Sequence, residues 1–113
     1  MAELIGAKIT SLCNTIIPVY YSEAETGSYP YMVYDQVVTE KRNKDGAYKL
    51  VSEAELKVIS NDFDEADGKA ALVAAALANG LTGSFSYRAG MVSKDCVDQV
   101  WTIQMNYTIT QKL

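Results

Sequence analysis

The sequence predicts a single α+β domain, residues 1–113, with a mainly antiparallel sheet packed by two helices in the order α-β-β-β-α-β-β. Two segments carry apolar residues at three- and four-residue spacing, which is typical of amphipathic helices. Other segments alternate apolar and polar residues, as a strand does when one of its faces lies on a core. A chain of 113 residues has room for one domain with one core.

The first helix is predicted over residues 2–15, because apolar side chains recur there at helical spacing. Pro18 ends this helix, since proline cannot donate the next helical hydrogen bond. Residues 19–21 then form a short strand, and the acidic, glycine-containing segment 22–28 forms an exposed loop.

An antiparallel hairpin with a protruding charged tip is predicted next. Residues 31–39 are aromatic and β-branched, which favours a strand, and Pro30 is tolerated at its start. The charged segment 40–46 ends in Asp-Gly, a dipeptide that favours turns. The return strand over residues 47–60 alternates apolar and charged side chains, so one of its faces is expected to meet water.

A second helix is predicted from Asp62. Asp62 followed by Glu65 fits a capping box, and the neighbouring carboxylates suit the positive end of the helix dipole. Asn79-Gly80 ends the helix. The many alanines predict a close approach to the sheet. Its buried stripe is expected to comprise Ala66, Ala70, Val73, Ala74 and Leu77.

Two closing strands are predicted over residues 83–92 and 97–110, joined near Ser93-Lys94-Asp95. The last strand has the clearest alternation in the chain, with apolar residues at every second position from Trp101 to Ile109. Its other face is uncharged, which is more typical of a surface that contacts another molecule than of one made for solubility. The candidate interface residues on this face are Thr102, Gln104, Asn106 and Thr108, in a polar series that continues to Thr110.

The composition argues against catalysis. The chain has no histidine, so Ser-His-Asp and Cys-His arrangements are excluded, although carboxylate or lysine catalysis remains formally open. We expect no enzyme activity, no catalytic residues, no cofactor and no metal site. Cys13 and Cys96 fit no metal spacing and are expected to be reduced thiols. The net charge of -4 argues against nonspecific nucleic-acid binding, and no apolar run approaches the roughly 18 residues of a membrane span.

Further surface candidates lie on the predicted hairpin. Eight tyrosines are many for this length; tyrosine is enriched at interfaces, but aromatic residues also favour strands. The basic tip has three interpretations: a solvated loop, a phosphate-binding patch, or a contact with an acidic neighbour such as the 22–28 loop of another subunit. The interface candidates from these two features are Tyr31, Tyr34, Lys41, Arg42 and Lys44.

The segment Tyr29-Pro30-Tyr31-Met32-Val33-Tyr34 resembles a Pro-Tyr-hydrophobic-hydrophobic-Tyr strand of the small tail-completion proteins (tail-terminator or tail-to-head joining proteins) of long-tailed bacteriophages. The short strand around Ile17-Pro18-Val19-Tyr20, the long strand 47–60 and the helix from Asp62 also match that family's order of elements. The resemblance covers nearly the whole chain, although the helix from Asp62 is richer in alanine than in the family.

The resemblance implies a structural virion protein that forms a homo-oligomeric ring, usually hexameric, at the head-proximal end of the tail. The implied partners are further copies of the chain, tail-tube proteins and head-connector proteins, while DNA only passes through the lumen. We expect no specific nucleic-acid binding and no membrane binding. The implied location is the virion tail, after assembly in the cytoplasm of the host bacterium.

Two other interpretations stay open. The chain could be another virion joining subunit of similar size, such as a head-closure or tail-tube protein; tube subunits polymerise openly, whereas a terminator stops at one ring. It could also be a small α+β ligand-binding module whose tyrosines line a pocket. A pocket protein can be a monomer, so self-association separates this interpretation from a ring.

Overall fold

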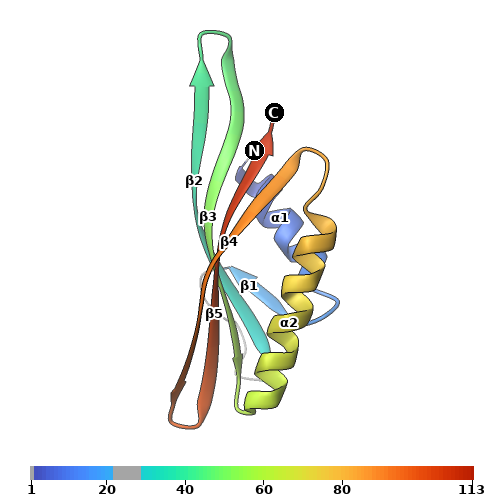
Figure 1. Ribbon diagram of the computed structural model, residues 1–113, viewed down its shortest axis with the longest axis vertical. Helices are drawn as coiled ribbons and strands as arrows, with labels where there is room; N and C mark the ends of the chain where they lie inside the picture. The colour runs from blue at the N-terminus through green and yellow to red at the C-terminus, as the bar shows by residue number, and fades with distance from the viewer. Residues whose placement is uncertain (1, 22–28) are drawn as a thin grey trace.

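Two helices cover one face of a five-stranded sheet in the computed structural model, which describes residues 2–21 and 29–113 (Figure 1). The strand order is β1-β2-β3-β5-β4; β1 runs parallel to β2, and all other neighbours are antiparallel. The predicted α+β class and the order α-β-β-β-α-β-β are confirmed. The elements are α1 (Ala2–Cys13), β1 (Val19–Tyr21), β2 (Tyr31–Asn43), β3 (Gly46–Ser60), α2 (Phe63–Gly80), β4 (Phe85–Val97) and β5 (Val100–Lys112).

The turn after α1 leads into β1, the short strand at one edge of the sheet. α1 ends at Cys13, two residues before the predicted end, and the N–H of Ile17 still donates to the Cys13 carbonyl at 3.1 Å. Pro18 donates no backbone hydrogen bond, but its carbonyl accepts one from the N–H of Met32 at 2.8 Å. This bond starts the parallel pairing of β1 with β2. The predicted loop over residues 22–28 lies outside the described residues.

The β2–β3 hairpin is longer than predicted. Its strands pair continuously from Tyr31↔Ile59 to Asn43↔Gly46, with one irregularity between Lys41 and Arg42. Most of the predicted charged tip is therefore strand, and only residues 44 and 45 form the turn. β5 pairs with β3 only as far as Lys49↔Lys112, so the hairpin projects beyond the sheet as a ribbon of two strands (Figure 1).

The junction of the last two strands differs from the prediction. The predicted connection, Ser93-Lys94-Asp95, lies inside β4, and the turn comes later, at Asp98-Gln99. Both turn residues have positive φ, 52° and 65°, which matches the right-handed twist of a two-residue hairpin. The prediction was wrong because this turn lacks the glycine that usually marks such a backbone.

The start of α2 uses one residue more than the predicted capping box. Asp62 is the N-cap, and its carboxylate accepts the N–H of Asp64 at 3.2 Å. Glu65 does not reach back to the Asp62 backbone; it accepts the Ser60 hydroxyl at 2.7 Å, and that hydroxyl accepts the Asp62 N–H at 3.2 Å. Ser60 therefore joins the end of β3 to the first turn of α2.

The core lies between the two helices and the covered face of the sheet. α1 contributes Ile5, Ile9 and Cys13 to a single apolar cluster. The predicted stripe of α2 is confirmed at four positions, and Ala74 is half-buried at the edge of the cluster. The fully buried residues of the sheet include Met32, Leu56, Val58, Ile103 and Ile109.

Candidate assembly surface

The second face of the sheet carries no helix; we call it the open face. Side chains of a strand alternate between the faces, so Glu53 and Glu55 lie on the open face while the buried Ala54 and Leu56 lie under the helices. The strand register brings odd-numbered residues of β2 and β3 and even-numbered residues of β5 onto this open face. The open face carries charged, amide and hydroxyl side chains together with Val33, Val37, Val51 and Ile59, and no described helix packs on it.

The four candidate residues of β5 lie together on the open face, in the middle of the sheet. Thr102, Gln104, Asn106 and Thr108 are all half-buried, because β3 and β4 flank them on both sides. The Gln104 amide donates to Glu55 Oε1 at 3.3 Å and to Asn106 Oδ1 at 3.2 Å. These contacts hold a continuous polar surface in place across two strands.

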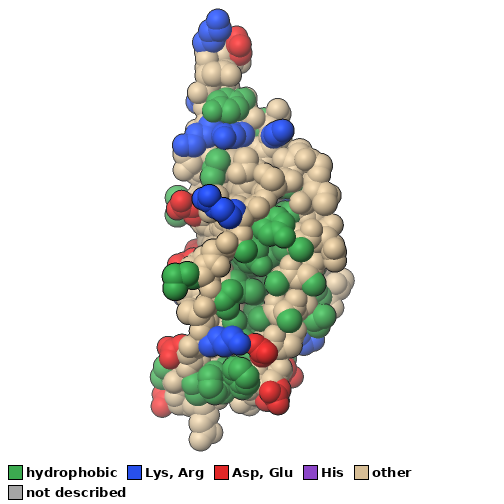
Figure 2. All heavy atoms as spheres, viewed as in Figure 1, with side chains coloured by type: hydrophobic (Ala, Val, Ile, Leu, Met, Phe, Trp, Pro, Cys, Tyr) green, Lys and Arg blue, Asp and Glu red, His purple; other side chains and the backbone are tan. Residues whose placement is uncertain are grey.

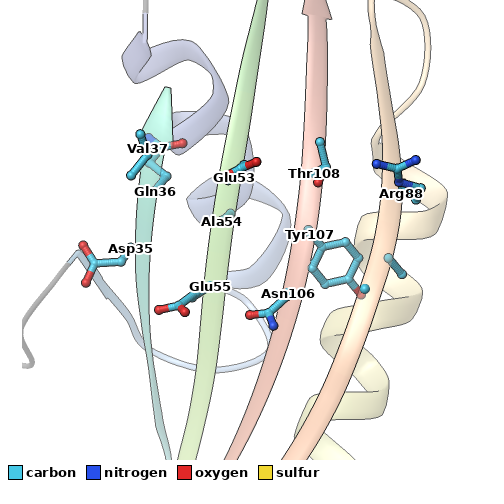
Figure 3. Close-up of a pocket in the computed structure, with 12 residues that line it drawn as sticks. Asp35, Gln36, Val37, Glu53, Ala54, Glu55, Arg88, Asn106, Tyr107 and Thr108 are labelled. Carbon is cyan, nitrogen blue, oxygen red and sulfur yellow. The ribbon is translucent and has the colours of Figure 1, made fainter. Parts of the chain in front are cut away.

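A shallow hollow of about 650 Å³ crosses this face from β2 to β4. Asp35, Glu53 and Glu55 lie on its β2–β3 side, and Arg88 lies on the β4 side. Figure 3 shows Asp35, Glu55 and Asn106 side by side on three adjacent strands. The hollow therefore has an acidic side and offers hydrogen-bonding groups from four strands.

The basic tip lies away from this hollow, on the projecting ribbon. Lys41, Arg42 and Lys44 are all exposed, and Arg42 pairs at 2.9 Å with Glu40, which is also exposed. Such a surface ion pair adds little stability. The acidic loop that was one expected docking partner, residues 22–28, lies outside the described residues.

The two tyrosine candidates of β2 point to opposite faces. Tyr31 is half-buried on the open face, where it stacks with Tyr29 at 5.9 Å between ring centroids and meets Tyr20 edge-on at 6.4 Å. Tyr34 lies on the covered face, 8% exposed, within the core. Tyr31 therefore belongs to the open face, whereas Tyr34 is almost fully buried on the covered face and reaches only the wall of a hollow beside α1.

β4 forms a long exposed edge that the sequence patterns did not predict. Except for Phe85, every residue of β4 is exposed, and β4 pairs only with β5 among the described strands. Large apolar side chains are exposed along it: Tyr87, Met91, Val92 and Val97. Figure 2 shows hydrophobic side chains gathered between β4 and α2. Long, apolar edges favour pairing with another chain. The mistaken break at residues 93–95 concealed this edge, although the apolar residues were visible in the sequence.

Two titratable groups of the core, Cys13 and Tyr107, have raised pKa values. Burial raises the pKa of the Cys13 thiol to about 11. Burial, together with nearby Tyr87 and Cys13, raises the pKa of Tyr107. Cys96 is an exposed free thiol on β4.

Over residues 2–21 and 29–113, no group of three metal-ligating side chains comes together, and no described helix is long and apolar enough to cross a membrane.

Tyrosines line two hollows of the surface. Tyr107 lines the one on the open face, while Tyr21 and Tyr34 line a second hollow of about 550 Å³ beside α1. The remaining lining of the second hollow is mostly small and uncharged, from Gly6, Ala7, Thr10, Ser11, Asn14 and Gln36.

Comparison with known proteins adds a likeness of fold. No protein-family model matches the sequence, and no curated protein matches it. Among solved structures, the chain is similar to a chain of the virion of a native gene transfer agent (GTA) particle, with a TM-score of 0.58 and 18% sequence identity. The alignment covers 93% of this chain and 84% of the virion chain. The two chains therefore share a fold over nearly their whole lengths.

Proposed function

We propose that this protein is a structural subunit of a phage-like virion, and specifically a tail-terminator (tail-completion) subunit that forms a homo-oligomeric ring. The observation that carries the proposal is the fold shared with a chain of the GTA virion over 93% of this chain. The order of elements and the Pro30–Tyr34 segment, which resemble tail-completion proteins, support the same assignment.

The surfaces of the subunit suit a ring. Identical subunits in a closed ring meet through two different patches, because each contact is heterologous. The chain offers separate surfaces of this kind: the polar open face with its projecting ribbon, and the exposed apolar edge of β4. On this proposal the ring, hexameric as in the family it resembles, lies at the head-proximal end of the tail.

The same proposal names the partners. One side of the ring would contact the tail tube and the other the head connector, with DNA passing through the lumen and no specific nucleic-acid contact. The net charge of -4 suits such a lumen, since like charge keeps DNA from binding to the wall. The protein would then be located in the tail of the virion and act without catalysis.

The test is the molar mass in solution by light scattering on a size-exclusion column, over a range of protein and salt concentrations, with negative-stain electron microscopy. We expect a discrete species of about six subunits that forms closed rings. A Met91→Lys variant should weaken the self-association of the subunits, because it places a charge on the apolar β4 edge, where Met91 is 77% exposed. Leu72→Lys serves as the matched control, because it also replaces an exposed apolar side chain by lysine, but on the outside of α2. Open filaments would instead favour a tail-tube subunit, and a monomer that also fails to bind tail tubes would contradict the proposal.

A further inference from the structure

The open face carries two groups of like charge on the same strands. Lys41 is the register partner of Lys49, and Lys49 is the partner of Lys112, so three lysines form a row across β2, β3 and β5; we call it the lysine row. Asp35 is the direct partner of Glu55, and Glu53 follows on the same face of β3. We call Asp35, Glu53 and Glu55 the carboxylate group.

Both groups are unfavourable within the isolated subunit, because like charges directly opposite each other on paired strands repel. The ion pairs among the described residues are Arg42–Glu40 and Lys94–Asp67, so neither group is neutralised by a partner there. The Gln104 amide is the hydrogen-bond donor that reaches Glu55. Each group therefore has charge left for a contact outside the subunit.

The two groups cannot neutralise each other in one subunit. The nearest members of the two groups, Lys49 and Glu53, are four residues apart on β3, about 13 Å along a strand, which exceeds the screening length of about 8 Å in physiological salt. The lysine row lies where β5 ends and the ribbon begins to project, so a neighbouring molecule can reach it. The carboxylate group lines the open-face hollow of about 650 Å³, which leaves room for incoming side chains.

We propose that the lysine row of one subunit contacts the carboxylate group of a second copy of this chain, and that this contact joins subunits head to tail. Three positive charges then meet three negative charges, which removes both sets of like-charge repulsion. The lysine row and the carboxylate group are different surfaces, so a contact that is not returned within the same pair is heterologous and propagates until it closes. The inference rests on the proposed ring and deepens it, since it names the charged side chains on both sides of a subunit contact.

A reciprocal charge swap tests this contact. The variant K41E/K49E makes the lysine row acidic, and D35K/E55K makes the carboxylate group basic. Each variant alone brings like charges together at every contact, and we expect its self-association constant to fall at least about tenfold. In an equimolar mixture every acidic row meets a basic group, so the native mass should return. In both the native protein and the mixture, association should weaken as salt rises.

Two controls accompany the swap. A71K adds a charge on the exposed side of α2, the helix that covers the other face of the sheet, and should leave the native mass unchanged. Circular dichroism and thermal unfolding report whether the swapped variants fold; each swapped pair is still a like-charge pair, so their unfolding midpoints should stay close to that of the native chain. The measured quantity is the molar mass by light scattering, for each variant, for the mixture and for the native protein.

The outcomes separate this contact from the proposed function. Variants that assemble like the native chain, or a mixture that stays dissociated, overturn the contact, and native rings would still support the terminator role. A mixture that stops at two subunits overturns the head-to-tail arrangement, because both contacts would then close within one pair. If the native protein forms open filaments, and these are lost in each swapped variant and return in the mixture, the result supports the contact but contradicts the terminator ring. A native monomer under all conditions overturns the contact, and binding to tail tubes then tests the function alone.

Discussion

The two faces of this sheet differ although the same strands build both. On β3 the fully buried Leu56 and the half-buried Lys57 are neighbours in sequence, yet one lies under the helices and the other on the open face. The covered face is almost entirely apolar, whereas the open face carries the amides, hydroxyls and unpaired charges. One face therefore holds the fold together, and the other is free to carry contacts that would be costly in a core.

The largest expected effect contrasts these two neighbours. Leu56→Ala removes a fully buried side chain and should lower the free energy of unfolding by about 2–5 kcal/mol, through lost burial and the cavity left behind. Lys57→Ala on the open face should change it by no more than about 0.5 kcal/mol. Urea denaturation of both variants measures the difference. Similar losses at the two positions would mean that the open face is also part of the stabilising core.

Two glycines of α2 extend the comparison to the helix that covers the sheet. A methyl group at Gly80 would overlap the Leu12 side chain of α1, whereas one at Gly68 would meet open space. Gly80→Ala should therefore cost about 1–3 kcal/mol through overpacking. Gly68→Ala should instead stabilise by about 0.5–1 kcal/mol, because alanine loses less backbone entropy in a helix. Thermal unfolding of the pair checks the opposite signs, and a tolerated Gly80→Ala would show a looser contact between the helices.

The joint between sheet and helix should have a smaller effect. Ser60 is fully buried and makes two hydrogen bonds, to the Asp62 N–H and to Glu65. Ser60→Ala removes both and should destabilise by about 1–2 kcal/mol. The exposed neighbour Asn61 provides the control, since Asn61→Ala breaks no described hydrogen bond. Equal unfolding midpoints for the two variants would show that the Ser60 hydroxyl is not needed to start α2.

The smallest effect concerns the two thiols: Cys13 is buried in the core, and Cys96 is exposed on β4. A thiol reagent at pH 8 should modify the exposed Cys96 in the folded protein and reach Cys13 only after unfolding. Burial raises the pKa of Cys13 from 9.0 to about 11, so the unfolded chain loses this proton at lower pH than the folded one. Stability should therefore fall as the pH rises from about 9 to 11.

Cys96→Ser is the control for labelling, because it should abolish modification of the folded chain. Cys13→Ala should flatten the alkaline decline in the free energy of unfolding, measured by urea denaturation at several pH values. Rapid labelling of native Cys13 would contradict its burial beneath the sheet.

Local patterns in the sequence were enough to predict most elements. The alternation of β5, the helical spacing of α1 and the acidic start of α2 each depend on residues close together in the chain, so they predicted the element types correctly. The boundaries were less accurate where the local signal was weak. Asp98-Gln99 adopts positive φ without glycine, so the turn between β4 and β5 was placed too early. The exposed edge of β4 was missed for the same reason.

The sequence by itself determined the fold class, the order of elements and the polar face of β5, because these follow from periodicity over a few residues. Only the tertiary structure decided that β5 lies between β3 and β4, that both helices cover one face, and that Tyr34 belongs to the core. The lysine row is the clearest case: its members come from three strands, and Lys41 and Lys112 are far apart in the chain. Hydrogen-bonded register, not sequence distance, brings such residues together, so no local pattern could have predicted them.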